Sequence, residues 1–259
     1  MRIATWNINS VRARLPHLLD WLRETAPDIA LLQELKCQEE AFPRMEVEEL
    51  GYNIAISGQK SYNGVAILSK FPIEDVVRAL PGDAEDIEAR YIECVANTPS
   101  GIVRVASIYV PNGQSPDSER FQYKLRFFDR LYAHACELWK LEEPLILGAD
   151  YNVAPAPIDV FNPQALEGTV CYHPEERKRF HRFLNHGFTD AYRACHPADE
   201  AYSWWDYRGG SWDKNEGMRI DHLLLSPEAA DRITSAGIDS YTRGKDKASD
   251  HAPVWVEIF

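Results

Sequence analysis

Apolar and β-branched residues occur along the chain in short runs, each bounded by Gly, Pro, Asn, Asp or Ser. Short apolar runs between turn-forming residues predict β-strands. We expect strands at residues 3–6, 28–33, 52–57, 64–69, 90–96, 102–110, 144–149, 219–226 and 253–258.

Three segments between these runs have a helical pattern. Apolar residues recur at helical spacing between positions 11 and 22, and again from Ser118 to Lys140. Pro16 is expected either to kink the first helix or to stand in the first turn of its main part. The third helix begins at Pro174, with two glutamates in its first turn, and ends at Gly187.

The order of these elements indicates the fold class. Several strands follow one another without a helix, which favours antiparallel or mixed sheets over a doubly wound parallel sheet. We therefore expect an α/β (α+β) fold with two sheets face to face and helices outside. A chain of 259 residues without a linker is expected to form one domain, residues 1–259. The Pro-rich segment 154–169 is expected to be a surface loop.

Composition excludes several classes of protein. The chain is 45% hydrophobic, has no apolar run long enough to cross a bilayer, and does not begin with a secretory signal, so a cytoplasmic location is expected. Its five cysteines are widely spaced and form no CxxC pair, which argues against a disulfide framework or a structural zinc site.

The net charge of −12, from 28 Lys plus Arg against 40 Asp plus Glu, taken alone counts against a nucleic-acid partner. For an enzyme this argument is weak, because a metal site requires its own carboxylates and a local basic rim can still attract a polyanion.

An unusual polar residue stands at one end of several predicted strands. In a mixed sheet, the ends of some strands and the starts of their antiparallel neighbours share one edge, so these groups can converge on one cleft. The residues are Asn7 and Asn9, Glu34, Tyr109 and Asn112, Asp150 and Asn152, Asp221, and Asp250 with His251.

Carboxylates and amides make up most of this set, with a single imidazole. Mg²⁺ prefers oxygen ligands and takes one or two protein carboxylates plus phosphate oxygens, so Mg²⁺ or Mn²⁺ fits, whereas zinc would require more His or Cys. Asp150, His251 and Tyr109 are candidates for orienting water or stabilising a phosphoryl group. Asp221 is the free carboxylate that can fix the tautomer of His251.

Each residue taken singly also has an ordinary structural explanation. Asp and Asn are common turn residues beside strands, Tyr109 fits a half-buried strand position, and the tryptophans of YSWWDY (202–207) fit core packing. The coincidence of acids and amides at many strand ends favours a functional site.

A series of motifs resembles the exonuclease III family of abasic-site DNA endonucleases, within the endonuclease/exonuclease/phosphatase superfamily. In order, they are RIATWNINSVRARL (2–15), DIALLQELK (28–36), NGVAILSK (63–70), IYVPNGQ (108–114), GADYNVAP (148–155), SWWDYRGGSWDKNEGMRIDHLLLS (203–226) and SDHAPV (249–254). The resemblance covers nearly the whole chain and implies a four-layer α/β sandwich. It also implies a divalent-metal-dependent hydrolase that cuts duplex DNA 5′ to abasic sites, leaves a 3′-hydroxyl, and often acts on blocked 3′ ends as an exonuclease or phosphatase.

The same resemblance implies roles for individual residues. Glu34 would be the principal metal ligand, with Asn7 and Asp250 beside it. Asp150 would align or deprotonate the attacking water, helped by Asn152. His251, paired with Asp221, would contact the phosphate opposite the metal. Tyr109, Asn112 and Arg90 would face the phosphate or the leaving group.

The DNA-binding residues follow from the same comparison. Trp204 and Met218 would line an apolar damage pocket, and Lys124 would touch the DNA backbone. An abasic sugar has already lost pairing and stacking, so such a pocket can select it without reading sequence. The basic and aromatic rim would consist of Arg208, Lys214 and Arg219 interleaved with Trp204, Trp205, Tyr207 and Trp212. One departure is Ala149 where the family usually has Gly before the catalytic Asp; Gly148 stands one position earlier.

Two other functions compete with this interpretation. The same site could serve a phosphoinositide, a sphingolipid or undamaged DNA, because fold does not fix function. A catalytically silent damage-binding module would bind without metal or turnover. The resemblance further implies a monomer without an obligate protein partner or a membrane association.

Overall fold

A computed structural model describes residues 1–259 and contains two six-stranded sheets and one two-stranded ribbon. The first sheet has the order β13 (Ile233–Ile238), β14 (Val254–Ile258), β1 (Arg2–Asn7), β2 (Ile29–Gln33), β4 (Val65–Ser69), β3 (Asn53–Ser57). The second has the order β5 (Ile73–Val77), β6 (Tyr91–Thr98), β7 (Gly101–Tyr109), β8 (Leu145–Asp150), β12 (Asp221–Leu225), β9 (Thr189–Asp190). The ribbon pairs β10 (Trp204–Trp205) with β11 (Gly217–Met218).

Each large sheet is mixed. The parallel pairs are β1 with β2 and β7 with β8, and the other strand pairs are antiparallel. The prediction of mixed sheets is therefore confirmed.

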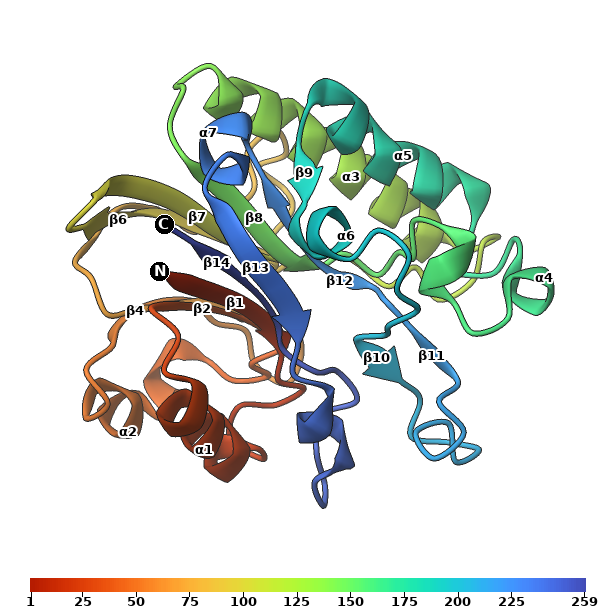
Figure 1. Ribbon diagram of the computed structural model, residues 1–259, viewed down its shortest axis with the longest axis horizontal. Helices are drawn as coiled ribbons and strands as arrows, with labels where there is room; N and C mark the ends of the chain where they lie inside the picture. The colour runs from red at the N-terminus through yellow and green to blue at the C-terminus, as the bar shows by residue number, and fades with distance from the viewer.

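Helices cover both outer faces of the sheet pair (Figure 1). The helices are α1 (Leu15–Thr25), α2 (Arg44–Glu48), α3 (Glu119–Trp139), α4 (Pro163–Leu166), α5 (Pro174–His186), α6 (Ala191–Cys195) and α7 (Pro227–Ala230), with 3-10 turns at Glu39–Ala41, Pro157–Asp159 and Ser240–Gly244. In Figure 1, α1 and α2 lie against the first sheet, and α3 and α5 lie against the second.

Three apolar clusters lie between these four layers. The central cluster joins the facing sides of the two sheets, for example Leu31 from β2 and Ile146 from β8. A second packs α1 under the first sheet, where Trp6 meets Trp21 edge to face. A third packs α3 and α5 on the second sheet around Phe128 and Phe183. The four-layer sandwich implied by the resemblance is confirmed.

The helix predictions hold with small shifts at the ends. Pro16 lies in the first turn of α1, which begins at Leu15, so residues 11–14 form a turn and not a helical segment. The Ser118 hydroxyl caps α3 by accepting from Phe121 N, and Gly187 ends α5 in a left-handed conformation.

All nine predicted strands are present, but some strands were not predicted. β5 reads IEDVV and is mostly exposed at the sheet edge, so it lacks an apolar alternation. β13 reads ITSAGI and includes small residues and a glycine, which weaken the strand pattern.

The expectation that segment 154–169 is a surface loop is wrong in part. It contains a 3-10 turn and α4, and Asp159 and Val160 within it are buried. Asp159 is buried because it pairs with Arg219 and Arg193, whose guanidinium groups lie 2.7 and 2.6 Å from its Oδ1.

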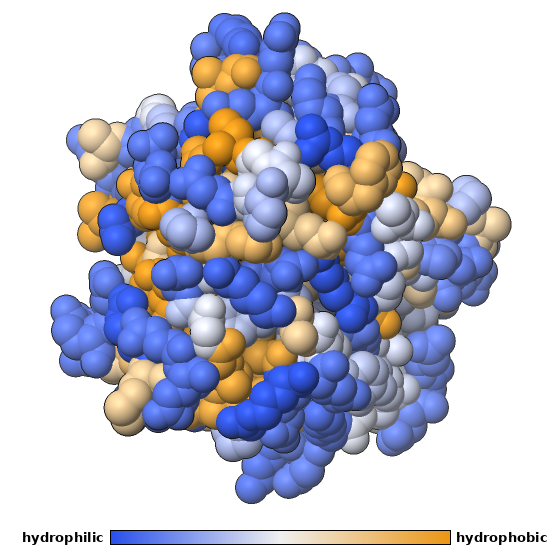
Figure 2. All heavy atoms as spheres, turned by 60° about the vertical axis from the view of Figure 1, so that its left-hand side comes forward, coloured by the Kyte–Doolittle hydropathy of each residue, from blue (hydrophilic) through white to orange (hydrophobic).

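Figure 2 shows one face on which hydrophilic side chains predominate and hydrophobic ones are visible between them. No helix is both long enough and apolar enough to cross a membrane.

The two sheets pack closely at Gly148 on β8. A Cβ built there would meet the Leu31 side chain and lie 3.0 Å from Leu223 Cδ2 and 3.3 Å from Thr5 Cβ. We expect Gly148→Ala to lower the free energy of unfolding by about 1–3 kcal/mol through overpacking. Urea denaturation measures this change, and an unaltered midpoint would show that the sheets can separate at this point.

Candidate active site

Most of the polar residues identified in the sequence meet at one edge of the sandwich. The strand register places Tyr109 opposite Asp150, Asp150 opposite Asp221, and Asn7 opposite Gln33, which precedes Glu34. Asp250 and His251 lie just before β14, at the same end as the last residue of β1, because Val254 pairs with Thr5 in the antiparallel register. We call this group, Asn7, Glu34, Tyr109, Asp150, Asp221, Asp250 and His251, the polar edge.

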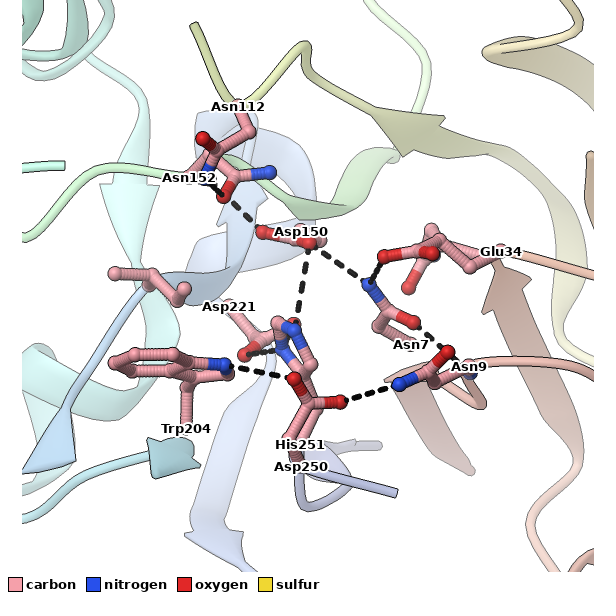
Figure 3. A network of polar contacts seen from close by, with 12 residues as sticks. Asn7, Asn9, Glu34, Asn112, Asp150, Asn152, Trp204, Asp221, Asp250 and His251 are labelled. Atoms are coloured by element: carbon pink, nitrogen blue, oxygen red, sulfur yellow. Dashed lines mark hydrogen bonds and ion pairs between the residues drawn. The ribbon is translucent and has the colours of Figure 1, made fainter. Parts of the chain in front are cut away.

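Asp150 is at the centre of the polar edge and is 1% exposed (Figure 3). Its Oδ2 accepts from Asn7 Nδ2 at 2.9 Å and lies 3.7 Å from His251 Nε2. Its Oδ1 accepts from the backbone N of Asn152 at 2.9 Å. These contacts fix both carboxylate oxygens.

His251 lies between two carboxylates. Its Nδ1 is 2.9 Å from Asp221 Oδ2, and its Nε2 faces Asp150. Burial lowers the pKa of His251, but Asp221 and Asp150 outweigh this effect and raise the pKa to about 10. The ring is therefore an imidazolium at neutral pH and donates from Nδ1 to Asp221.

Asp150 and Tyr109 at the polar edge have raised pKa values. Burial raises the pKa of Asp150, and the nearby Asp221 adds to the rise against the opposing charge of His251, so that the pKa is about 7. Burial, with Glu34 and Asp150 close by, raises the pKa of Tyr109 well above its usual value, so its hydroxyl remains protonated. A carboxyl group with a pKa near 7 suits general base catalysis.

Asn7 holds two carboxylates together. Its Nδ2 donates to Glu34 Oε1 and Asp150 Oδ2, both at 2.9 Å, while its Oδ1 accepts from Asn9 N at 3.0 Å. In this arrangement the Asn7 amide nitrogen donates to the carboxylates, and its role as an oxygen ligand to a metal stays a prediction. Glu34 itself has a left-handed backbone (φ 53°), an uncommon conformation for a side-chain-bearing residue.

Ligand atoms of Glu34, Asp150 and His251 lie within 4.8 Å of one another. Two carboxylates with no sulfur fit a hard divalent cation such as Mg²⁺ or Mn²⁺. His251 completes this group of three, and an imidazole coordinates a metal only in its neutral form.

Asp250, expected as a ligand, is outside this group of three. Its Oδ1 accepts from Asn9 Nδ2 at 2.8 Å and its Oδ2 from Trp204 Nε1 at 3.0 Å (Figure 3). Burial raises the pKa of Asp250, but His251 and these two hydrogen bonds outweigh it and keep the pKa below its usual value. The carboxylate is therefore ionised and linked to the pocket wall.

Two hollows meet at the polar edge. A cavity of about 380 Å³ has an apolar wall that includes Cys171, Trp204 and Met218. A groove of about 460 Å³ shares Glu34, Tyr109 and Asn112 with this cavity and is otherwise lined mainly by polar residues. These polar residues include Lys36, Tyr62, Arg90 and Arg120.

Arg90 reaches the polar edge as predicted. Its guanidinium lies 4.6 Å from the centre of the Tyr109 ring, and its Nε donates to Glu88 Oε2 at 2.6 Å. Asn112 also lies where expected, donating from Nδ2 to Asn152 Oδ1 at 3.0 Å.

The prediction that Lys124 touches the DNA backbone is wrong. Its side chain is fully buried between α3 and α5, pairs with Glu176, and donates to the backbone oxygens of Asn112 and Asn152. The sequence shows a lysine in an amphipathic helix. It does not show that an acidic partner and two backbone carbonyls lie against the buried face of that helix.

Part of the predicted basic and aromatic rim is also buried. Arg219 is 1% exposed, with Nη1 on Asp190 Oδ2 at 2.8 Å, and Trp205 packs against Trp212 with ring centres 4.9 Å apart. Arg208 and Lys214 remain exposed, although Arg208 pairs with Asp206 at 3.0 Å. The rim is therefore smaller than the sequence suggested.

Three residues at the site were not predicted to act there. Lys36 pairs with Glu34 at 2.9 Å, the Ser203 hydroxyl donates to Asp221 Oδ2 at 2.6 Å, and Cys171 Sγ lies 3.7 Å from Asn152 Oδ1. The position of Lys36, two residues after Glu34, could have indicated from the sequence that this lysine lies at the site. Nothing in the sequence distinguishes Ser203 or Cys171 from other small residues in turns.

The chain is similar to known nucleases along its full length. Residues 4–251 match the Endonuclease/Exonuclease/phosphatase family. An exodeoxyribonuclease III from Haemophilus influenzae is 36% identical over 267 aligned positions, covering all of both chains. The DNA repair nuclease APEX1 of Danio rerio is 34% identical, with 98% of this chain and 81% of that protein covered.

Solved structures of nucleases and a phosphatase also resemble this chain along its full length. A 3′ phosphatase from Neisseria bound to a product DNA hairpin superimposes with a TM-score of 0.96 at 37% identity, over 100% of this chain and 99% of that one. An AP endonuclease from Archaeoglobus fulgidus gives a TM-score of 0.92 at 36% identity, with the same coverage.

The charge of His251 is open to direct measurement. Because its folded pKa is raised above the unfolded value of 6.5, the stability that it contributes is fully present below about pH 6.5 and is lost as the pH rises through about 10. We expect Asp221→Asn to lower the His251 pKa by roughly one to three units. Imidazole ¹⁵N chemical shifts across pH 5–11 measure it, with Asp206→Asn as the control that leaves the His251 pKa unchanged. Equal pKa values in the wild type and Asp221→Asn would show that Asp221 does not hold the proton on His251.

Proposed function

Because the chain belongs to the endonuclease/exonuclease/phosphatase family, we propose that it hydrolyses the backbone of duplex DNA on the 5′ side of abasic sites and leaves a 3′-hydroxyl. The same site would remove phosphates and nucleotides from blocked 3′ ends, because both reactions place a phosphoryl group at the polar edge. The observation that carries the proposal is the meeting of Asp150 and His251 with a pocket walled by Trp204 and Met218. The similar chains described as a 3′ phosphatase and an AP endonuclease support it.

Asp150 is the proposed group that orients and deprotonates the attacking water. Its buried carboxylate has a pKa near 7 and is held by Asn7 and by the backbone N of Asn152. Asn152 thus positions Asp150 through its main chain, while its own Nδ2 is held by Val110 O at 2.9 Å.

The imidazolium of His251 is proposed to stabilise the negative charge that builds up on the phosphoryl oxygens. Its proton on Nε2 points toward Asp150, into the space that the phosphate would enter, while Asp221 keeps the ring charged and oriented. The protonated Tyr109 hydroxyl is placed to donate to the phosphate or to the leaving oxygen. Asn112 and Arg90 would complete the set of donors around the phosphate.

The family is metal-dependent, and Glu34 with Asp150 presents suitable oxygen ligands for Mg²⁺ or Mn²⁺. Such an ion would neutralise charge on the phosphate and favour ionised Asp150. Lys36 beside Glu34 supplies a fixed positive charge at the same place.

Recognition of the lesion is assigned to the apolar wall of the cavity of about 380 Å³. Met218 is 9% exposed, and Trp204 is held in place by its Nε1 hydrogen bond to Asp250. A sugar without a base can enter a cavity of about 380 Å³ without losing base pairing or stacking. The exposed Arg208 would reach the DNA backbone at the rim.

We also propose that residues 1–259 act as one catalytic domain and as a monomer, located in the cytoplasm and without an obligate protein partner. The single domain is supported by the polar edge itself, whose residues end, directly follow or precede strands of both large sheets.

The proposal predicts Mg²⁺-dependent incision at a lesion. A duplex oligonucleotide with one tetrahydrofuran abasic analogue should be cut 5′ to the analogue with Mg²⁺ and remain intact with EDTA, because a sugar without a base enters the cavity most readily and the family is metal-dependent. Gel analysis beside an undamaged duplex and a duplex with a 3′-phosphate measures all three activities. Removal of the 3′-phosphate without incision would restrict the function to 3′-end processing. No cleavage of any DNA would refute the nuclease proposal and favour phosphorylated lipids or small molecules as substrates of the same site.

The proposed roles predict different kinetic defects. Asp150→Ala should lower kcat by about 10³-fold or more, because the general base is lost, and His251→Ala should also lower it by about 10²–10³-fold. Glu34→Ala should mainly raise the Mg²⁺ concentration needed for half-maximal rate, by about tenfold or more. Mg²⁺ titrations of each variant separate these effects, with the remote Glu137→Ala as a control. A near-normal rate in Asp150→Ala would overturn its assignment.

A further inference from the structure

Lys124 is a buried cation with three partners and no exposed atom. It lies on the inner side of α3, pairs with Glu176 of α5, and donates from Nζ to Asn112 O at 3.0 Å and to Asn152 O at 2.6 Å. Both members of the ion pair are 0% exposed. An ammonium group has three N–H donors, so these partners use all of its capacity.

The two carbonyl groups depend on this lysine. No other protein group donates to Asn112 O or Asn152 O. Each belongs to a loop that leaves the polar edge, after β7 and after β8, and their side chains meet through Asn112 Nδ2 and Asn152 Oδ1. The Asn152 carbonyl is buried, and a buried carbonyl without a donor is costly, whereas Asn112 is an exposed residue. The loss of Lys124 would therefore chiefly favour rearrangement of the loop after β8.

Glu176 extends the connection to a third segment. Its Oε2 accepts from His173 N at 3.0 Å, which closes the first turn of α5. The preceding Cys171 lines the apolar cavity, and its carbonyl accepts from Ala154 N at 2.7 Å. Lys124 therefore joins the segments that carry Asn112, Asn152 and Cys171.

Asn152 links Lys124 to the catalytic carboxylate of Asp150. Its carbonyl is held by Lys124, and its N–H holds Oδ1 of Asp150 at 2.9 Å. Asn152 has a left-handed backbone (φ 51°), a conformation that persists in a side-chain-bearing residue when its surroundings enforce it. Release of the carbonyl would let this residue relax and turn its N–H away from Asp150.

We infer that Lys124 is a positioning residue, which fixes the loops bearing Asn112 and Asn152 and so aligns Asp150 and the cavity wall. It touches neither substrate nor metal. This inference rests on the proposed nuclease function, because it concerns the geometry of that same site.

The test must separate positioning from stability. Lys124→Met alone leaves Glu176 buried and unpaired, so its effects would mix misfolding with misalignment. In the double variant Lys124→Met/Glu176→Met both charges are gone and the volume is nearly kept, so the fold should be retained, but the two carbonyls still lack a donor. We expect this variant to stay folded but to melt below the wild type, because the two carbonyls and His173 N lose their partners. We expect kcat on abasic duplex to fall about 10²-fold, with KM changing less than threefold.

Two matched variants complete the kinetic design. Arg179→Met/Asp129→Ala removes an ion pair that also joins α5 to α3 but reaches no loop of the polar edge, so kcat should not change. Glu176→Gln removes the charge of the partner while Lys124 keeps its bonds to the two carbonyls. It should lower the melting temperature and leave kcat within about threefold of the wild type. If Glu176→Gln instead loses as much kcat as the double variant, or the folded double variant turns over at the wild-type rate, the carbonyl bonds do not position the site.

A readout without DNA distinguishes failure of this inference from failure of the proposed function. Hydrogen exchange of the Asn152 side-chain amide, which donates to Val110 O, should be faster in the double variant than in the wild type and the Arg179→Met/Asp129→Ala control. Unchanged exchange would refute the positioning role whether or not the wild type cuts DNA. Faster exchange in a chain that cuts no DNA would refute the nuclease proposal and support the positioning role.

Discussion

The site depends on how the chain tolerates three carboxylates in one largely buried space. Asp150 and Asp221 are at most 1% exposed, and Glu34 is linked to Asp150 through a single amide group of Asn7. Like charges this close repel strongly where water is scarce, so the arrangement requires compensating positive charge. The His251 imidazolium compensates Asp221, and Lys36 partly compensates Glu34. The carboxylate pair Glu34 and Asp150 is then the natural place for a divalent cation.

The spacing of these charges is set by the packing of the two sheets. Glu34 follows a strand of the first sheet, whereas Asp150 ends a strand of the second. Between the sheets, Gln33 donates to Ser107 at 3.0 Å, and Gly148 allows Leu31 and Leu223 to approach closely. A single parallel pair in each sheet, β1 with β2 and β7 with β8, brings these strand ends to the same side.

Buried cations explain why a protein with an acidic net charge has a smaller basic surface than its composition suggests. Lys124 and Arg219 are both buried and pair with acids, so they serve the architecture of the loops and not the approach of DNA. Attraction of a polyanion therefore falls to local groups such as Arg208 and Arg120 near the two hollows. A count of charges along the sequence does not distinguish a buried structural cation from an exposed one that attracts DNA. The reason is that segments far away in the chain decide which side chains are buried.

The sequence by itself determined the nine main strands, the three long helices, the mixed four-layer sandwich, and the identity of the residues that meet at the polar edge. These follow from local periodicity, from turn residues and from motifs that remain contiguous in the chain. Only the tertiary structure decided which polar atoms face one another. It showed that Asn7 donates to the carboxylates, that Asp250 is held by Asn9 and Trp204, and that Lys124 lies in the core. Most of these pairings join residues more than twenty-five positions apart, as Asn7 with Glu34 and Lys124 with Asn152 do. Local sequence carries no information on the direction in which a side chain turns once distant strands have come together.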